Sequence, residues 1–384
     1  MAVAKLRGFA DTLMAMDSLQ QMRERLGEID QEILKLVARR QELALEIGKL
    51  KIERGAPTRD YQQEKEVVER AKEAAADQGL PARLGEKLCL LLIEASLTAQ
   101  EQERVSLSGE GQGQTALVIG GAGKMGRWMC RFLASQGYDV HVADPQGSPD
   151  GYPHLREWTS SPLDQDVIVV AAPMKVSREV LEKMAEDPPQ GLIFDIGSLK
   201  SPLREALHKL AGAGAKVTSI HPMFGPDTDL LSRRHVIFVD VGVPRATEEA
   251  RRLFESTMAV QSDADLESHD RLMAYVLGLS HALNIAFATA LAESQEALPT
   301  LAQLSSTTFE SQLEVAAKVS EDNPHMYFEI QSLNDYGTES LAALLYAVER
   351  VRSAVLAKDE KQFVNLMLKG RSYLKDAAAL RREE

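Results

Sequence analysis

A glycine-rich turn near residue 120 has the residue types and spacing of a phosphate-binding loop. The run ALVIG leads directly into GAGKMG, where Gly121, Gly123 and Gly126 form the pattern G-x-G-x-x-G. Such glycines let the backbone approach a pyrophosphate at a helix N-terminus. A second β run, DVHVAD, ends in Asp144. An acid at this interval hydrogen bonds ribose hydroxyls and repels a 2′-phosphate, so the motif predicts binding of NAD(H) rather than NADP(H).

The predicted cofactor-binding residues are Gly121, Gly123, Lys124, Met125, Gly126 and Asp144. The alternative is a glycine turn in an α/β domain that binds no nucleotide. A strand, a helix, a second strand and a terminal acid surround the glycines in the expected order, which favours the binding site over the plain turn.

Two later β runs end in polar side chains. Ser198 follows GLIFDIG directly, and His221 opens the Gly/Pro-rich segment HPMFGPD. Ligands of a doubly wound sheet bind outside the carboxyl ends of its strands, so we expect both residues near the nicotinamide end of the cofactor. A lone loop histidine is more often structural or solvated, but a rigid loop of this composition positions side chains for function.

A cation interrupts an apolar seam in the N-terminal third of the chain. Apolar residues follow each other at spacings of three and four from Leu19 to Leu50, and Arg40 takes one of the seam positions. A buried guanidinium is costly unless an anion meets it, so Arg40 marks either a structural salt bridge or an anion-binding site. Lys51 shares its helix face, whereas Arg23 lies about 100° around the helix and could serve a partner's pocket.

A later helical row changes from apolar to polar. Leu84, Leu88 and Leu92 are followed, at the same spacing of four, by Ser96 and Gln100. Residues four apart lie on one helix face. The row therefore either runs out to solvent or lines a polar pocket.

Between these two helices lie Asp60, Gln63 and Glu64. The first two could be a helix-capping pair, and the third an acid in the first helical turn. The N-terminal zone as a whole offers cations, hydroxyl and amide donors and acids. It has no nucleophile–base pair and no metal-ligand spacing. This inventory suits electrostatic stabilisation of an anionic ligand more than covalent catalysis.

Length and composition limit the class of protein. The chain has 384 residues, 44% of them hydrophobic, which predicts a globular protein of two or three domains. Its 44 basic and 57 acidic residues give a net charge of −13, which argues against nucleic acid as the main partner. Cys89 and Cys130 are expected to be buried and reduced, as in a cytoplasmic protein. The N-terminal residues make a poor secretory signal.

The stretch 272–292 carries no formal charge and is long enough to span a bilayer. Ser280, His281 and Asn284 lie at its middle. Polar groups at mid-span need protein partners, so we expect a helix buried in a soluble core or a dimer interface instead.

These patterns predict a multidomain protein. An all-α domain is expected over 12–106, with one long helix over about 18–54 and two shorter ones, followed by a linker at 107–114. An α/β Rossmann domain with a parallel sheet is expected over 115–265, and an all-α domain over 266–384. Three helices of such unequal length bury their apolar seams best as an intertwined dimer.

The first zone resembles the all-helical chorismate mutase class. The resemblance covers about residues 17–105 and rests on MRERLGEIDQEILKLVARRQELALEIGKLK, the RD dipeptide ending at Asp60, and EASLTAQ. It implies that Arg40 binds a substrate carboxylate and that Arg23 reaches the partner subunit's site. Lys51 and Gln100 would contact the ether oxygen whose bond breaks.

The same resemblance implies that Asp60 and Glu64 face the substrate hydroxyl and that Ser96 helps to hold a carboxylate. One position departs from the family pattern, because this chain has Gln63 where the family usually has arginine. The residues suit a pericyclic rearrangement, which needs one compressed conformer and charge stabilisation but no proton transfer.

The rest of the chain, about 115–375, resembles prephenate dehydrogenase. The motifs are DIGSLK, HPMFGPD, ESHDRLMAYVLGLSH and STTFESQLEVAAKVSEDNPHMYFEIQ. The resemblance implies that His221 accepts the proton of the substrate's ring hydroxyl as hydride leaves, that Ser198 orients His221 and that hydroxyl, and that loss of carbon dioxide aromatises the ring. His269 and His281 match family positions, and we expect structural roles for both.

Lys318 stands where the dehydrogenase family commonly has an arginine for the ring carboxylate. Lysine supplies charge without the bidentate fork, so Lys318 is a candidate substrate-binding residue.

The two resemblances together predict a cytoplasmic, bifunctional chorismate mutase–prephenate dehydrogenase of tyrosine biosynthesis. It would use NAD and small-molecule substrates, act as a homodimer through its C-terminal helical domain, and bind neither nucleic acid nor membrane. One alternative is arogenate as the dehydrogenase substrate. The other is a helical dimerisation module fused to a nucleotide-sensing protein. Arg40, Ser96 and Gln100 on inward helix faces argue against the second alternative.

Overall fold

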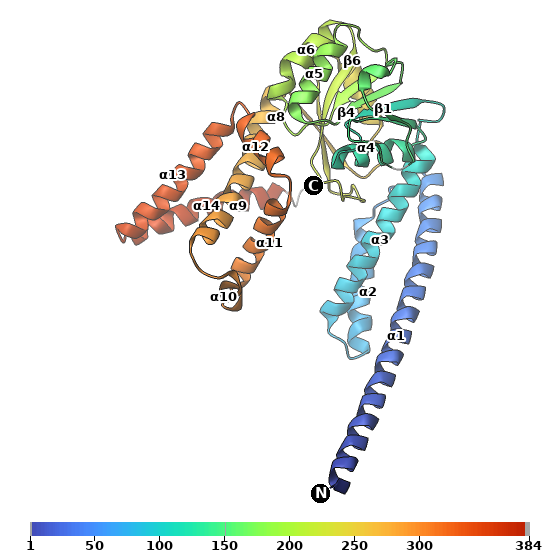
Figure 1. The fold of residues 1–384 in the computed structure, drawn as a ribbon, viewed down its shortest axis with the longest axis vertical. Helices are drawn as coiled ribbons and strands as arrows, with labels where there is room; N and C mark the ends of the chain where they lie inside the picture. The colour runs from blue at the N-terminus through green and yellow to red at the C-terminus, as the bar shows by residue number, and fades with distance from the viewer. Residues whose placement is uncertain (1, 150, 381–384) are drawn as a thin grey trace.

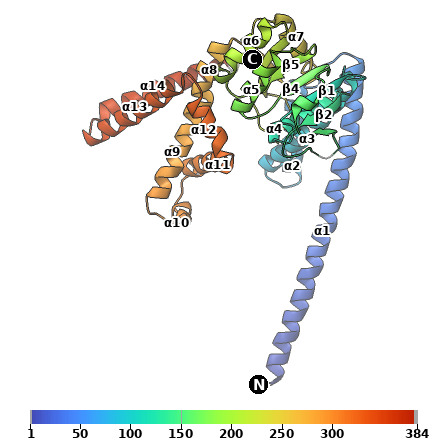
Figure 2. The same cartoon turned by 45° about the horizontal axis from the view of Figure 1, so that its top comes forward.

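The computed structural model describes residues 2–149 and 151–380. Figure 1 shows an α/β unit from which two helical units extend, the N-terminal helices on one side and the C-terminal helices on the other. The same separation of the two helical units is visible from a second direction in Figure 2. The predicted fold class, with an α/β unit between two all-α units, is therefore confirmed.

The N-terminal unit consists of three helices, α1 (Ala2–Glu53), α2 (Tyr61–Asp77) and α3 (Ala82–Ser108). Both α1 and α2 pack against α3. The helix α1 begins earlier than expected and has 52 residues, so it is roughly 78 Å long at 1.5 Å per residue. Gly79 ends the second helical segment with a φ of 71°, a conformation that favours glycine.

The described residues of the chain leave the apolar seam of α1 exposed. The seam side chains from Leu19 to Leu50 are exposed, for example Leu26 at 63% and Leu36 at 65%. The buried cluster between α2 and α3 is small and centres on Cys89, Ile93 and Leu97. The seam is therefore free to pack against another surface.

The α/β unit is built on one sheet of eight strands in the order β3-β2-β1-β4-β5-β6-β7-β8. The strands are β1 (Thr115–Ile119), β2 (Asp139–Ala143), β3 (His154–Leu155), β4 (Val167–Val170), β5 (Leu192–Asp195), β6 (Lys216–Pro222), β7 (His235–Val239) and β8 (Val260–Ala264). The main helices are α4 (Lys124–Ser135), α5 (Met174–Met184), α6 (Arg204–Gly212) and α7 (Pro244–Arg252), with short 3₁₀ turns η1 (Trp158–Ser160) and η2 (Ser201–Leu203). One core layer contains α4 and α7 side chains, and the other contains α5 and α6 side chains.

The sheet of this unit differs from the expectation in two respects. The sheet is mixed rather than parallel, because β7 runs antiparallel to β6. The short strand β3 and the polar strand β8 were not anticipated, since neither shows an apolar run. In the segment predicted to be a linker, α3 continues through Ser108, and a Cβ on Gly111 would lie 2.3 Å from the Tyr138 ring.

The C-terminal unit is helical. Its elements are α8 (Leu266–Met273), a π-helical turn η3 (Ala274–Leu279), α9 (Ser280–Glu293), α10 (Leu298–Gln303), α11 (Thr307–Glu321), α12 (Pro324–Ser332), α13 (Gly337–Leu356) and α14 (Glu360–Leu380). The helix α9 packs against α11, and η3 packs against α13.

The continuous helical stretch Leu266–Glu293 is long and apolar enough to cross a membrane by length and composition, and only 22% of its most apolar window is buried within the chain. Most of this window is therefore not buried by the described residues of its own chain. Its predicted place in a soluble core or a dimer interface stays a prediction.

Candidate active sites

The turn after β1 forms an open cradle at the N-terminus of α4. A Cβ on Gly126 would lie 2.2 Å from the Gly120 carbonyl oxygen, and one on Gly121 would lie 2.7 Å from Val142 Cγ1. Gly120 has a φ of 84°. Only glycine fits this path, and the amides at the start of α4 have no side-chain cap. The geometry fits a bound pyrophosphate.

Asp144 joins the end of β2 to this turn. Its Oδ2 accepts a hydrogen bond from the Ala122 amide at 3.1 Å, and its Oδ1 accepts one from the Gln146 amide at 2.8 Å. Of the remaining residues in the motif, Met125 is half-buried, and Lys124 is exposed and pairs with Asp322 of the C-terminal unit. The residues present therefore fit a dinucleotide.

His221 lies near the end of β6 with its ring buried. Its Nδ1 lies 2.9 Å from Nε2 of His269, and Nδ1 of His269 lies 2.7 Å from Oδ1 of Asp270. Both partners come from α8 and are 0% exposed. The imidazole is thus held from one side by a histidine and a carboxylate of the C-terminal unit.

A buried lysine joins the carboxyl ends of β5 and β6. Lys200 is 0% exposed, and its Nζ donates to Asp195 Oδ1 at 2.8 Å and to the Ile220 carbonyl at 3.0 Å. Asp195 Oδ2 accepts a hydrogen bond from Ser219 Oγ. The backbone amide of Lys200 donates to Asp270. One network therefore connects both strand ends with α8.

These surroundings shift the protonation of the imidazoles. Burial, followed by the neighbouring His269 and Lys200, lowers the pKa of His221 well below its ordinary value of 6.5. Burial also lowers the pKa of His269, although Asp270 opposes the shift. Burial acts to raise the pKa of Asp270, but hydrogen bonds from His269, Ser201 and Lys200 together outweigh it, so the pKa is lowered. The group combines a neutral imidazole pair with an ionised carboxylate near pH 7.

The predicted role of Ser198, to orient His221 and the substrate hydroxyl, stays a prediction. Ser198 is half-buried in the loop after β5, and among the described residues the hydrogen-bond partner of Nδ1 of His221 is Nε2 of His269. The contact joins residues 48 apart on different units, so no local pattern reveals it. The only sequence signal was the HD dipeptide at 269–270 within the matching ESHD segment.

Two other candidates lie in the C-terminal unit. Lys318 is exposed on α11. His281 is half-buried on α9 with its ring 4.4 Å from the Tyr327 ring, centroid to centroid, and its buried Nδ1 has no hydrogen-bond partner among the described residues.

The candidate site of the N-terminal unit lies between α1 and α3. Arg40 Nη1 donates to Ser96 Oγ at 2.5 Å and to the Leu92 carbonyl at 2.7 Å. Gln100 Nε2 donates to the Ala44 carbonyl at 2.7 Å, and its Oε1 is buried without a partner among the described residues. Ser96 and Gln100 are buried, so the polar end of the row faces inward.

Four predicted residues lie outside this group. Asp60 is exposed and caps α2 by accepting from the Gln63 amide, as in the capping alternative. Glu64 forms a two-pronged ion pair with Arg59. Lys51 donates to the Thr58 carbonyl at 2.7 Å. Arg23 is exposed on α1, seventeen residues or roughly 25 Å along the helix from the Arg40 position, so one chain does not bring it to this pocket.

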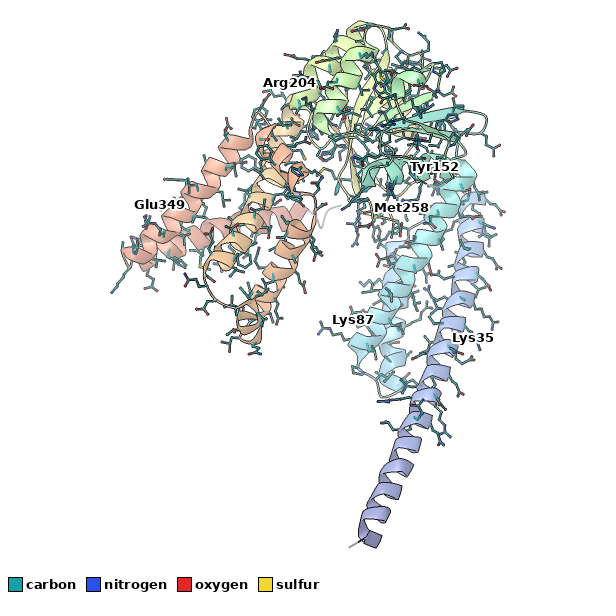
Figure 3. The ribbon with its side chains drawn as sticks, in the orientation of Figure 1. Lys35, Lys87, Tyr152, Arg204, Met258 and Glu349 are labelled. Atoms are coloured by element: carbon teal, nitrogen blue, oxygen red, sulfur yellow. The ribbon has the colours of Figure 1, made fainter. Side chains whose placement is uncertain are left out.

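The two candidate sites are joined by a buried acid on α3. Glu101 Oε2 accepts from the Leu231 amide at 2.7 Å, and Oε1 accepts from the Met258 amide at 2.5 Å. Figure 3 shows Met258 beside the end of α3 that meets the α/β unit. Leu231 belongs to the β6–β7 loop, which starts just after His221. Burial raises the pKa of Glu101.

Known protein families match most of the chain. Residues 22–101 match the family model for chorismate mutase type II. Residues 157–261 match the nucleotide-binding domain of prephenate dehydrogenase, and residues 265–369 match its dimerization domain. The glycine turn lies before the second matched range, so its assignment rests on the geometry above.

Individual proteins give the same picture. A chorismate mutase of Methanocaldococcus jannaschii is 31% identical over 86 residues, covering 22% of this chain and 87% of that protein. The T-protein of Enterobacter agglomerans is 25% identical over 312 residues, 81% of each chain. The T-protein of Haemophilus influenzae is 23% identical over 366 residues, 94% of this chain and 93% of that one.

Among solved structures, prephenate dehydrogenase from A. aeolicus in complex with hydroxyphenyl propionate and NAD⁺ superposes with a TM-score of 0.52 at 18% identity. The superposition covers 70% of this chain and 98% of that one, and it supports the fold. Fold and sites together define an enzyme that joins an all-helical isomerase to a dinucleotide-binding dehydrogenase. The chain belongs to the type II chorismate mutase family through its N-terminal helices and continues into both domains of a prephenate dehydrogenase, as bifunctional enzymes of tyrosine biosynthesis do.

Proposed function

We propose that the N-terminal site converts chorismate to prephenate and that the second site converts prephenate to 4-hydroxyphenylpyruvate with NAD⁺. The observation that carries the proposal is the presence on one chain of two separate polar clusters. One is the Arg40–Ser96–Gln100 group between α1 and α3. The other is the buried His221 pair beyond a glycine turn.

In the mutase site, Arg40 binds a carboxylate of chorismate, with Ser96 as its neighbour. Gln100 and Lys51 contact the ether oxygen, where negative charge develops as the bond breaks. The unpartnered Oε1 of Gln100 supports this role, because a buried polar atom without a partner is costly in the absence of a ligand. Fixed donors that meet developing charge lower the barrier of a rearrangement that needs no proton transfer.

Three further residues complete the proposed mutase site. Asp60 and Glu64 face the substrate hydroxyl once Glu64 gives up part of its pairing with Arg59. Arg23 enters from the partner subunit, which agrees with its exposure on α1 beside an apolar seam that the described residues of its own chain leave exposed.

The dinucleotide site takes NAD⁺, which when bound supplies the acceptor for a hydride. Gly121, Gly123 and Gly126, with Lys124 and Met125, form the pyrophosphate turn. Asp144 hydrogen bonds the ribose hydroxyls, and its negative charge disfavours a 2′-phosphate.

In the dehydrogenase site, neutral His221 accepts the proton of the ring hydroxyl as the hydride departs. Loss of carbon dioxide from the ring carbon then completes an aromatic ring and drives the step. Ser198 is proposed to contact the substrate hydroxyl. Lys318 is proposed to supply positive charge toward the ring carboxylate.

The protein is further proposed to be a homodimer in the cytoplasm. The match of 265–369 to a dimerization domain supports the dimer, as does the exposed apolar surface of α1 and of the C-terminal helices, where Leu345 is 72% exposed. Two free, buried cysteines agree with a reducing compartment.

Two assays test the proposal directly. Purified protein given chorismate alone should consume it and form prephenate, and protein given prephenate with NAD⁺ should form NADH and release carbon dioxide. Arogenate with NAD⁺ is the third arm. A higher kcat/KM for arogenate than for prephenate would replace the proposed dehydrogenase substrate, and no turnover in either of the first two arms would refute the corresponding half.

A further inference from the structure

His221 is the end member of a hydrogen-bonded chain of three side chains. Asp270 Oδ1 accepts from Nδ1 of His269, and Nε2 of His269 faces Nδ1 of His221 at 2.9 Å. Asp270 also accepts the backbone amides of Lys200 and Ser201. Both carboxylate oxygens of Asp270 therefore act as acceptors.

The hydrogen bonds among these three side chains allow only one arrangement of protons on the two histidines. Because an ionised carboxylate can only accept, Nδ1 of His269 must carry a proton. A neutral imidazole then has a bare Nε2, which can only accept, so Nδ1 of His221 must carry a proton too. The remaining nitrogen of His221, Nε2, is left with a free lone pair.

We propose that His269 and Asp270 are positioning residues for the dehydrogenase reaction: they fix the tautomer of His221 so that Nε2 is the base, and they stabilise the charge that the base acquires. The inference rests on the proposed function of His221. When the substrate hydroxyl loses its proton, that proton binds Nε2 of His221. The proton on Nδ1 either remains shared with His269 or moves onto its Nε2, and the positive charge faces the Asp270 carboxylate.

Two other charged side chains near the His221 ring, Lys200 and Asp195, determine where positive charge is disfavoured. Lys200 approaches from the loop after β5 and is paired with Asp195, while Asp270 and His269 approach from α8. The lysine disfavours a permanent charge on His221, and the carboxylate, one imidazole further away, tolerates a transient one. The base is therefore neutral at rest and has a partner for the charge during the reaction.

The decisive variant is Asp270→Asn. The amide oxygen can keep accepting the Ser201 and Lys200 amides, while the NH₂ group replaces Oδ1 and donates to Nδ1 of His269. That reverses both imidazoles and places a proton on Nε2 of His221. Asp265→Asn is the matched control, because Asp265 caps the same helix and lies outside the chain of three side chains.

The tautomers are read by ¹⁵N NMR of the cofactor-free protein labelled at histidine, with His221 assigned by loss of its signals in His221→Gln. In the unchanged protein and in Asp265→Asn, Nε2 of His221 should resonate as a pyridine-type nitrogen and Nδ1 as a pyrrole-type nitrogen. In Asp270→Asn the two types should exchange. The same tautomer in both Asp270 forms would overturn the proposal.

Kinetics provide the second readout. Asp270→Asn should lower the dehydrogenase kcat by about 10²–10⁴-fold, the range of a lost general base, with KM for NAD⁺ and mutase activity nearly unchanged. In His269→Gln, the amide oxygen can accept from Nδ1 of His221. This variant should therefore keep the tautomer of His221 and lose less of the dehydrogenase kcat than Asp270→Asn. Near-normal kcat in a tautomer-reversed variant would also overturn the proposal. If the unchanged protein did not oxidise prephenate, the proposed function would fail while the tautomer result stood.

Discussion

At the scale of single residues, the environment of His221 determines when it can act. The ring is buried beside a second imidazole and within reach of the Lys200 ammonium group, and both neighbours disfavour its cationic form. A general base must be neutral to accept a proton. The same burial that makes the residue inaccessible to bulk water thus keeps it in its reactive state.

The acid limb of the dehydrogenase reaction follows from this lowered pKa. Because the pKa of His221 lies well below 6.5, kcat/KM for prephenate should stay level as the pH falls through 6.5 and decline only at lower pH. The unfolded chain takes up this proton near about 6.5, so folding stability also begins to fall there. A pH profile of kcat/KM measures the limb, and half-loss of activity at or above pH 6.5 would contradict the assignment.

Cofactor choice should depend on the charge of Asp144. Asp144→Asn keeps the size of the side chain and one acceptor for the neighbouring amides but removes the repulsion of a 2′-phosphate. The ratio of kcat/KM for NADP⁺ to that for NAD⁺ should therefore rise, measured with prephenate saturating. Asp139→Asn, at the opposite and exposed end of β2, should leave the ratio unchanged. An unchanged ratio in Asp144→Asn would show that another residue excludes the phosphate.

At the scale of elements, helical periodicity was the most informative sequence pattern for predicting which side chains face inward. The period of about 3.6 residues placed Arg40 and the Ser96–Gln100 row on inward faces, and the structure brings Arg40 to Ser96. The order of strands and helices around the glycine turn was equally readable, because each strand is a short apolar run. These features depend on neighbours within a few residues.

Elements defined by long-range pairing could not be predicted in the same way. The strand β7 pairs antiparallel to β6 after a loop whose path depends on its contact with α3, and β8 is too polar to show as a strand. His269 was expected to be structural, since nothing local reveals that α8 packs against the end of β6. The contacts that complete the proposed dehydrogenase site join residues far apart in the sequence, so the sequence alone does not predict them.

The glycine turn offers a test of its geometry. Gly126→Ala would put a Cβ 2.2 Å from the Gly120 carbonyl oxygen, so the backbone of the turn must shift and NAD⁺ binding should be lost. Gly212→Ala, in open space at the end of α6, is the matched control and should bind NAD⁺ normally. Calorimetric titration measures both, and mutase activity reports whether the Gly126→Ala protein is folded. Normal NAD⁺ affinity in the first variant would show that the turn does not hold the pyrophosphate.

At the scale of the whole molecule, the α3 helix connects the N-terminal unit to the α/β unit. Its last turns carry Gln100 into the proposed mutase site and, at the next position, Glu101 into the α/β unit. In the predicted linker, Gly109 lies against Gln136 and Gly111 against Tyr138 of the α/β unit. A change in α3 should therefore affect both the N-terminal unit and the α/β unit.

Glu101→Gln should loosen this connection. Glutamine can accept only one of the two amide hydrogen bonds as strongly as the carboxylate does, which should cost about 1–3 kcal/mol. Hydrogen exchange should accelerate at the Leu231 and Met258 amides while the β1 and β4 amides stay protected. Glu103→Gln, two residues further along α3 and paired only with Lys49 among the described residues, is the control. Unchanged exchange at both amides would mean that the α3 acid does not hold the loop.

The exposed part of α1 that precedes Arg40 and carries Arg23 has a genetic consequence. If the partner supplies Arg23, a dimer of one Arg23→Ala chain and one Arg40→Ala chain contains one pocket with both arginines and one with neither. Two alleles that are each inactive as mutases should therefore complement one another in a single cell. With random mixing, about half of the dimers contain one chain of each kind, and each of these has one intact pocket out of two. The mixture should therefore regain about a quarter of the wild-type mutase activity. If the mixture stayed as inactive as its components, each mutase pocket would have to be built from a single chain.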